Sequence, residues 1–452
     1  MQNQINFLSE SLALLLIVVV SLIFALIGII HSRKYQGLSN YLTAGRNVGT
    51  ASLTTSLVAS ALGAWILFGP ASAATWGGIG SVVGYSLGTA FPMIAFIFLG
   101  KKIRKIFPKG NTLTEFIHFK FGKNLFNLIL VLTIFYMFIF LCAEITAVSM
   151  LVNYISGTPL WLTATLVITT TLIYTLYGGL RASILTDNLQ FFIILILLFI
   201  CFYYIFFQND HISFEVVYVN SKHLLSGKYV PNYTAGFTFF IAVSATNLFH
   251  QGNWQRVFAA KNNQILKKSL LLSFIIIIPV VFFMGICGIF AISLDSEINP
   301  DLAFFSILLK DKIEFLSIII IILAVSLTVS TVDTLVNAIS SLVIVDGRNF
   351  YNGSKKKNFL LLSKIFVIIL SVISLINASK GFSNLYLFLF ADLLCCSAVF
   401  AVFYVFYQNN FREKNTIMSI LLGLFFGLLL FPTPDFSQSI LIGVLFPFDF
   451  FP

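Results

Sequence analysis

Residues 47–75 read NVGTASLTTSLVASALGAWILFGPASAAT, a stretch long enough to cross a bilayer but with an interrupted centre. Its middle, residues 59–65, consists mostly of small side chains, and Pro70 follows. A second apolar stretch, residues 233–257, carries the polar run 246–255 at membrane depth. Backbone that leaves the helical conformation inside a membrane is tolerated only where it lines a cavity in the protein. The two stretches therefore predict two broken helices that face a common cavity.

The composition of the whole chain fits a protein dissolved in lipid. Of its 452 residues, 58% are apolar and only 10% are charged, and the mean hydropathy is +0.97. A soluble domain has roughly 45–50% apolar and about 25% charged residues. These values predict an all-α integral membrane protein and exclude disordered, collagenous, disulfide-stapled and nucleic-acid-binding classes. At about 20 residues per spanning helix, the chain supplies roughly a dozen helices and forms a single membrane domain over residues 1–452.

Apolar runs separated by charged clusters predict twelve membrane spans. They are 8–31, 47–75, 78–100, 124–155, 159–177, 186–207, 233–257, 269–293, 313–345, 359–378, 383–407 and 415–432. A further apolar piece, residues 439–450, is only about half the length of a span and contains Pro447 and Asp449. It is either a shortened thirteenth span or a segment that lies in the interface, so the count is twelve to thirteen.

The positions of the basic residues predict the orientation of the chain. If the first helix runs from outside to inside, 21 of the 27 Lys and Arg fall on the cytoplasmic side. They lie in the loops 32–46, 101–123, 178–185, 255–268, 346–358 and 408–414. Cytoplasmic loops carry an excess of Lys and Arg. We therefore expect a plasma (inner) membrane protein with its N-terminus outside, and the net charge of +10 reflects this asymmetry.

The two interrupted helices occupy equivalent places in two sets of five spans. Each is the first of its set, in residues 47–207 and in residues 233–407, with one extra helix (8–31) before them and the segment 415–452 after them. Because five is an odd number, the second set must lie inverted relative to the first. Paired broken helices in inverted repeats are typical of secondary transporters with a site near the bilayer midplane.

Polar side chains gather on the span 313–345. Ser330, Asp333, Thr334 and Asn337 share one helical face, and Thr331 is adjacent. Together with carbonyls freed at a helix break, these groups offer the hard oxygen ligands that suit a small alkali cation. Ser and Thr can instead bond back to their own helix and permit close packing.

Three other acids lie within the predicted spans. Asp187 follows Thr186 near a helix start, where it either caps the helix or binds an ion. Glu144 is expected to pair or hydrogen-bond within the bundle, and nothing nearby identifies a partner for Asp392. His250 has no second ligand at metal-binding spacing, so we expect it either to line the cavity or to be satisfied by neighbouring carbonyls.

Other energy sources and chemistries lack their signatures. The chain has no glycine-rich phosphate loop followed by Lys, and no nucleophile placed with a base. An enzyme and an ATP-driven pump are therefore not predicted, and any driving force must come from an ion gradient. No organic cofactor is expected.

Five ordered motifs resemble the sodium:solute symporter family, which includes proline, pantothenate, sialic acid, glucose and urea transporters. They are YLTAGR (41–46), WILFGP (65–70), YGGLRA (177–182) with Thr186, Asp187 and Gln190, QRVFAAK (255–261) and STVD (330–333). The resemblance covers residues from about 40 to 350. It implies a LeuT-type core of ten helices in a 5+5 inverted repeat.

The resemblance also implies site residues. The main sodium site would use carbonyls of Ala59, Leu62 and Leu327 with the hydroxyls of Ser330 and Thr331. A second cation site in some members falls on Asp187, Ser330, Asp333 and Thr334, which leaves the number of sodium ions open. Ala61 stands where the proline transporters have an acid, which argues against proline as solute.

Together these features predict a sodium-coupled symporter that imports a small polar solute such as an amino acid, sugar, carboxylate or urea. The solute is expected between the broken helices, at Ser60, Gly63, Trp65, Asn247, His250, Gln251 and Trp254. Two alternatives remain: a membrane sensor or binding module of the same fold, and a proton-coupled carrier that uses Asp333 or Glu144. The lipid bilayer is the other expected partner.

Overall fold

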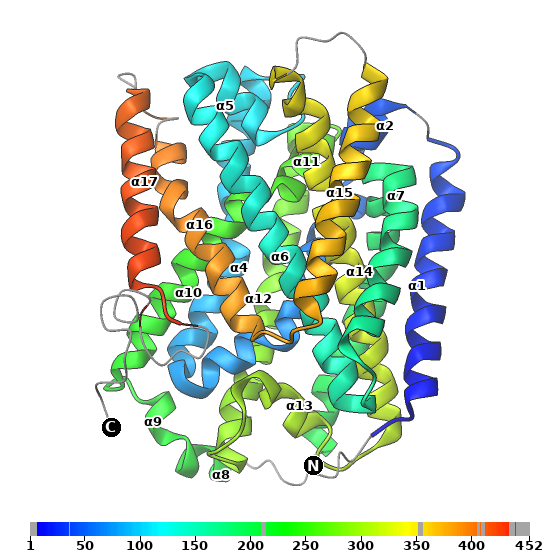
Figure 1. The fold of residues 1–452 in the computed structure, drawn as a ribbon. Coiled ribbons are helices and arrows are strands. Elements are labelled where there is room, and N and C mark those ends of the chain that lie inside the picture. The colour runs from blue at the N-terminus through cyan, green and yellow to red at the C-terminus, as the bar shows by residue number, and fades with distance from the viewer. Residues whose placement is uncertain are drawn as a thin grey trace.

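The computed structural model describes residues 7–35, 37–208, 214–350, 356–404, 407, 412–433 and 439, and the regular structure in this part is helical (Figure 1). The α-helices are α1 Glu10–Ser32, α2 Leu38–Thr43, α3 Thr50–Ala61, α4 Gly69–Ile106, α5 Leu113–Phe121, α6 Lys123–Ser156, α7 Leu160–Tyr203, α8 Phe214–Asn220, α9 Lys222–Leu225, α10 Val230–Phe249, α11 Gln251–Ala259, α12 Asn263–Leu294, α13 Ala303–Leu308, α14 Glu314–Val345, α15 Lys356–Ala378, α16 Asn384–Tyr404 and α17 Glu413–Leu430. Short turns of other helix types connect them: η1 Ala44–Arg46, η2 Ala64–Leu67, η3 Tyr204–Gln208, η4 Pro300–Leu302 and η5 Asp346–Phe350.

Nine helices in the described part are long and apolar enough to cross a membrane. The difference from twelve has a structural cause. Two predicted spans, 159–177 and 186–207, form one continuous element that reverses at Gly179, whose φ is 59°. The stretches 47–75 and 233–257 are each divided into shorter helices. With these divisions the helices correspond to the twelve predicted spans, whereas the segment 440–450 lies outside the described residues.

Gly78 and Gly179 form the two sharp reversals in the first set of helices. Both have positive φ values, 58° and 59°, which residues with a side chain rarely adopt. At Gly78 the second half of the broken first helix turns into the rest of α4. Glycine at these two places therefore allows consecutive spans to follow each other without a loop.

Small residues bring the two sets of helices into backbone contact. A Cβ on Gly84 of α4 would lie 2.1 Å from the carbonyl oxygen of Gly236 on α10. A Cβ on Gly288 of α12 would lie 2.0 Å from the carbonyl oxygen of Ala71 on α4. Such close approach is typical of helix packing in membranes. Each broken stretch is thereby packed against the second span of the other set.

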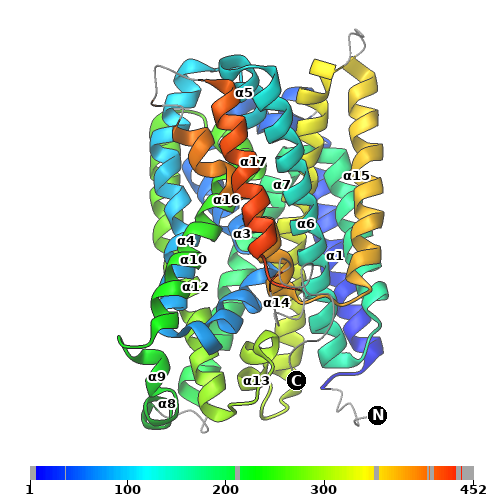
Figure 2. The ribbon, with the colours of Figure 1, turned by 60° about the vertical axis from the view of Figure 1, so that its left-hand side comes forward.

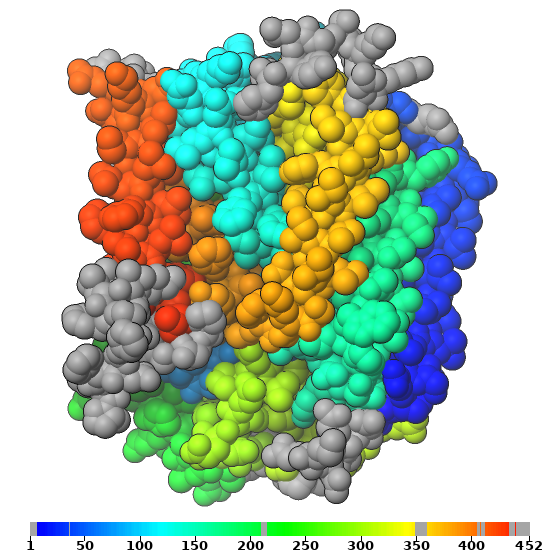
Figure 3. Space-filling view, viewed as in Figure 1, coloured from blue at the N-terminus to red at the C-terminus, as the bar shows by residue number. Residues whose placement is uncertain are grey.

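α14 is the central helix of the bundle. In the apolar stretch of α14, 83% of the residues are buried, whereas in the apolar stretch of α17 only 6% are buried. It contacts α1, α3, α6, α7 and α15. Helices α1, α15 and α17 lie at the periphery and expose many Leu, Ile and Phe side chains, as expected for a lipid-facing surface (Figure 3).

The segments predicted to be cytoplasmic lie at one end of the molecule. α2, α5 and the starts of α15 and α17 share that end, and α8, α9 and α13 lie at the other (Figures 1 and 2). One part of the charge prediction is wrong. Arg256, which the sequence places in a basic loop, belongs to α11 and is completely buried.

Candidate functional site

The first predicted helix break lies at Leu62 and Gly63. α3 ends at Ala61, and Leu62 (φ −97°, ψ 88°) leaves the helical conformation before η2 begins. The Glu144 carboxylate of α6 accepts hydrogen bonds from the backbone N–H groups of Ala64 (2.9 Å) and Trp65 (3.4 Å). A helix start has unpaired N–H groups and a positive dipole end, and a carboxylate satisfies both. Glu144 therefore stabilises the break from within the bundle.

The second predicted break lies at His250, between α10 and α11. His250 (φ −61°, ψ 107°) is extended, and its Nδ1 accepts a hydrogen bond from Gly252 N–H at 3.1 Å. Its carbonyl oxygen accepts from the N–H groups of Asn253 (3.0 Å) and Trp254 (3.3 Å). The histidine thus caps the start of α11 with both its ring and its backbone. The structure confirms both breaks.

A small cavity lies between the two breaks. Its volume is about 30 Å³, room for roughly two water molecules. The lining residues are Ser60, Ala61, Trp65, Tyr85, Phe140, Val243, Thr246, Asn247, His250, Phe388 and Asp392. Four of the seven residues predicted to bind solute are among them: Ser60, Trp65, Asn247 and His250. A cavity of this volume is too small for an organic molecule, so solute binding requires the surrounding helices to move.

The other three predicted solute residues lie outside this cavity. Gly63 faces Glu144 and Thr331. The Gln251 Oε1 accepts from Leu113 N–H at 3.1 Å, so this side chain connects α11 to α5. Trp254 is fully buried against Phe96, and its Nε1 donates to the carbonyl of Leu248 at 2.8 Å. The sequence showed that these residues were near a break but not which way they point.

One residue predicted for sodium, Thr331, lies where α14 passes the first break. A Cβ on Gly63 would lie 2.7 Å from Thr331 Oγ1, so the unwound backbone touches α14. Thr331 Oγ1 donates to the Leu327 carbonyl at 3.2 Å, and Ser330 Oγ donates to Asp187 Oδ1 at 2.6 Å. Each hydroxyl keeps oxygen lone pairs that can bind a cation. Ala59 and Leu62, at the end of α3, are also buried, and terminal carbonyls of a helix lack their usual partners.

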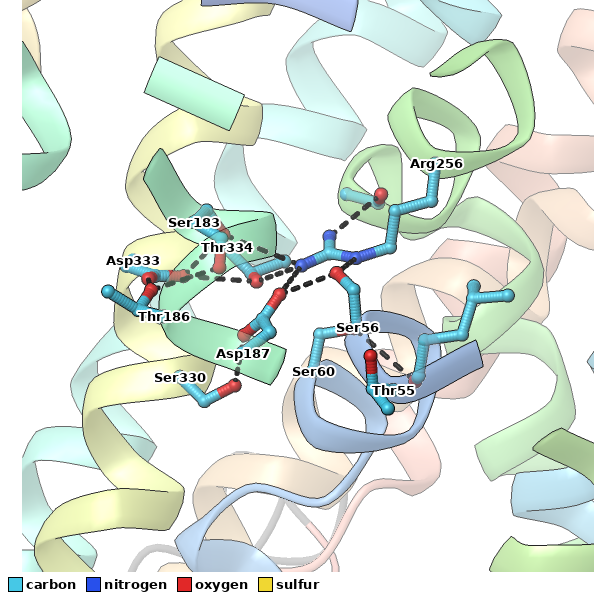
Figure 4. A network of polar contacts seen from close by, with 12 residues as sticks. Thr55, Ser56, Ser60, Ser183, Thr186, Asp187, Arg256, Ser330, Asp333 and Thr334 are labelled. Atoms are coloured by element: carbon cyan, nitrogen blue, oxygen red, sulfur yellow. Dashed lines mark hydrogen bonds and ion pairs between the residues drawn. The ribbon is translucent and has the colours of Figure 1, made fainter. Parts of the chain in front are cut away.

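A guanidinium occupies the place predicted for a second cation. Arg256 Nη2 lies 2.7 Å from Asp187 Oδ2 and 2.9 Å from Thr334 Oγ1 (Figure 4). Its Nε donates to Ser56 Oγ at 2.7 Å, and its Nη1 donates to the Gly252 carbonyl at 3.1 Å. All these side chains are fully buried. Sequence reasoning missed Arg256 because it follows the polar run and resembles a loop charge.

Asp333 is enclosed by hydroxyl donors beside this ion pair. It accepts from Tyr174 (2.6 Å), Ser183 (2.8 Å), Thr186 (3.2 Å) and Thr334 (3.3 Å). Buried carboxylates need such partners because desolvation is costly. Asp333 therefore has a complete set of neutral donors, whereas Asp187 has the guanidinium.

Asp392 of α16 is the carboxylate that lines the cavity. Thr246 Oγ1 of α10 donates to its Oδ1, and no hydrogen bond from a described residue reaches its Oδ2. The sequence indicated an intramembrane acid here but no partner, because Thr246 lies 146 residues away. Tyr85 and Phe140 gave no signal at all, since the chain contains 51 Phe and 16 Tyr.

Known proteins resemble this chain over most of its length. The sequence model of the sodium:solute symporter family matches residues 41–423. The Spermidine transporter DUR31 of Candida albicans is 24% identical over 407 residues, which are 88% of this chain and 76% of that protein. The Sodium/myo-inositol cotransporter 2 of Bos taurus is 24% identical over 452 aligned residues, with 87% of this chain and 66% of that protein covered.

A solved structure has the same fold. It is the substrate-bound outward-open state of a sodium-coupled sialic acid symporter, with a TM-score of 0.70 and 15% identity. The match covers 94% of this chain and 98% of the other. It confirms the expected all-helical membrane fold with two sets of five helices.

Proposed function

This chain belongs to the sodium:solute symporter family, and from that membership we propose that it imports a small polar solute together with sodium by alternating access. The observation that carries the proposal is the contact of the unwound backbone at Gly63 with Thr331 of α14, next to a small cavity between two broken helices. Broken helices of this kind bind ions and solutes near the bilayer midplane.

Sodium would bind between the end of α3 and α14. Its ligands in this proposal are the carbonyls of Ala59, Leu62 and Leu327 and the hydroxyls of Ser330 and Thr331. Asp187 accepts a hydrogen bond from the Ser330 hydroxyl, which orients the lone pairs of the hydroxyl oxygen away from the carboxylate. An ion here would tie α3 to α14 and favour one arrangement of the first break. Coupling requires that sodium and solute each bind better when the other is present, typically by about 1–3 kcal/mol.

One sodium ion per cycle is proposed rather than two. The residues of the second predicted cation site, Asp187, Asp333 and Thr334, already surround Arg256 or accept hydroxyl donors. A guanidinium held in place by several hydrogen bonds supplies the positive charge that a second ion would bring. Asp333 and Glu144, the relay candidates of a proton-coupled carrier, are both fully hydrogen-bonded and lie outside the cavity lining.

The proposed orientation follows the basic end of the molecule. The end with α2, α5 and the starts of α15 and α17 would face the cytoplasm of a plasma membrane, and the N-terminus would lie outside. Arg256 no longer counts toward this asymmetry, but the remaining loop charges still exceed those at the opposite end about four-fold.

The relatives leave the charge of the solute open. Their names specify a polyamine, an uncharged polyol and an acidic sugar, all small and rich in polar groups. We propose a solute of that size, bound near Ser60, Trp65, Asn247 and His250.

Sodium-driven uptake into proteoliposomes tests the function. The purified full chain is tested with an inward sodium gradient and with a potassium gradient of the same size, against a panel of small solutes. The double variant Ser330→Ala, Thr331→Ala should lose sodium-stimulated uptake. The matched control Ser326→Ala, Thr328→Ala removes the same groups about one turn earlier in the same helix and should retain it. Equal sodium dependence in both double variants would refute the assignment.

A further inference from the structure

The charged and aromatic groups around the cavity indicate which class of solute it accepts. Asp392 contributes a carboxylate, and among the described lining residues there is no Lys or Arg. Its Oδ1 accepts one hydrogen bond from Thr246, a neutral donor. A carboxylate at membrane depth without a cationic partner is costly. The cavity therefore favours an occupant that brings positive charge.

Several backbone N–H groups at both helix breaks are already hydrogen-bonded within the protein. The start of a helix normally attracts anions because its N–H groups are unpaired. Here Glu144 accepts the N–H groups of Ala64 and Trp65 at the first break. At the second break His250 accepts those of Gly252, Asn253 and Trp254. A carboxylate-bearing solute would find these donors occupied and would lie near the like charge of Asp392.

Aromatic rings form a large part of the cavity wall. Trp65 stacks on Tyr85, with ring centroids 5.6 Å apart and an interplanar angle of 17°. Phe140 meets Phe388 edge to face at 5.0 Å and His250 at 6.2 Å. Aromatic faces attract ammonium groups through the ring quadrupole, and the attraction grows when water is excluded. His250 Nδ1 accepts the Gly252 N–H, which is the behaviour of a neutral imidazole.

We propose that the transported solute is a small organic cation whose ammonium group binds between Asp392 and the rings of Trp65 and Phe140. Ser60 and Asn247 supply polar groups for a second amine or a hydroxyl of the same molecule. This inference rests on the proposed function because it names the solute of the same site. The cavity holds only about 30 Å³, so the alkyl part of the solute enters as the surrounding helices separate.

A matched set of four-carbon compounds tests the charge class. The protein in detergent with sodium present is incubated with 1,4-diaminobutane, erythritol or succinate, and thermal stabilisation is measured. Methylammonium, choline and spermidine extend the cationic panel. Stabilisation by at least one cation, with none by erythritol or succinate, supports the proposal. Stabilisation by erythritol or succinate alone, or by no cation, overturns it.

The variant Asp392→Asn tests the role of the carboxylate. It keeps the shape of the side chain and should weaken binding of the effective cation about 30-fold or more, because a buried charge partner is lost. The control Asp295→Asn removes one negative charge from an exposed segment beyond α12 and should bind as the unaltered protein does. Unchanged affinity in Asp392→Asn overturns the proposal. If that variant does not insert, the compound panel on the unaltered protein decides.

Failure of this inference and failure of the proposed function give different results. Sodium-driven uptake of erythritol or succinate, without uptake of any organic cation, would support sodium symport and refute the cationic solute. If an organic cation binds in a way that depends on Asp392 but its uptake does not depend on the sodium gradient, the cation site is supported and sodium symport is refuted.

Discussion

Replacing Arg256 by Gln should destabilise the protein severely, because it leaves the Asp187 carboxylate buried without a counter-charge. Arg256 and Asp187 are both fully buried, and their atoms Nη2 and Oδ2 are 2.7 Å apart. Breaking a buried ion pair by removing one partner costs about 3–5 kcal/mol, whereas removing both charges costs much less. We therefore expect Arg256→Gln and Asp187→Asn each to be less stable than the double variant.

The buried thiols of the chain provide the assay. Cys142, Cys201, Cys287 and Cys395 are free and buried, so a thiol-reactive dye reports their exposure during thermal unfolding in detergent. The control is Arg181→Gln, at the same end of the bundle. Arg181 is partly exposed, donates to the Ala44 carbonyl at 3.3 Å and stacks on Tyr35, so its loss should cost roughly 0–1 kcal/mol. Strictly additive effects of the two single variants would refute the ion-pair reasoning.

Sodium dependence of the same melting curves tests the single-ion proposal. In the unaltered protein sodium should stabilise through one site, as expected for a ligand that binds only the folded state. In Arg256→Gln the oxygens of Asp187 and Thr334 lose their cation, so sodium should stabilise this variant more strongly and with a steeper concentration dependence. An identical sodium response in both proteins would show that Arg256 does not replace an ion.

Three further predictions follow from the structure. Gly63→Ala should abolish solute uptake while the chain still inserts, because the new Cβ would lie 2.3 Å from Glu144 Oε1; adding Glu144→Asp, whose shorter side chain leaves room, should restore part of the transport. Gln251→Leu should lower the melting temperature because it removes the hydrogen bond that connects α11 to the start of α5. The Leu113 N–H would lose its acceptor, which should lower the free energy of unfolding by about 1–3 kcal/mol. Proteases should then cut the segment 107–113 more readily. Burial raises the pKa of Asp301 above its ordinary value of 3.8, against the opposing hydroxyls of Ser383 and Ser72. Its stabilising contribution is therefore complete below about pH 3.8 and is lost as the pH rises through the folded-state pKa. As the pH rises above about 3.8, the melting temperature of Asp301→Asn should therefore change less than that of the unaltered chain.

The helix breaks could be predicted because their cause is local. Small residues at 59–65 and polar groups at 246–255 disfavour a continuous apolar helix, and both breaks occur inside these runs. The spans could be predicted from hydropathy for the same reason. Gly179 was read as part of a loop, yet its positive φ joins two spans into one element without a loop.

The contacts that define the site depend on residues far apart in the sequence. Glu144 reaches the first break across 80 residues, and Asp392 meets Thr246 across 146 residues. No spacing rule links such pairs, so the sequence identified the acids but not their partners. Arg256 was assigned to a loop because a charge at the end of a span is usually solvated, whereas here Asp187 and Ser56 compensate its burial.

The guanidinium of Arg256 has an electrical consequence for transport. It is covalently part of α11, so it does not diffuse across the membrane as an ion does. Each charge that crosses the membrane potential gains about 2.3 kcal/mol per 100 mV. With one sodium and a singly charged cationic solute, about 4.6 kcal/mol per 100 mV would drive each cycle. A second sodium ion would add to that driving force. The Arg256 guanidinium instead stabilises Asp187 and carries no charge across the membrane.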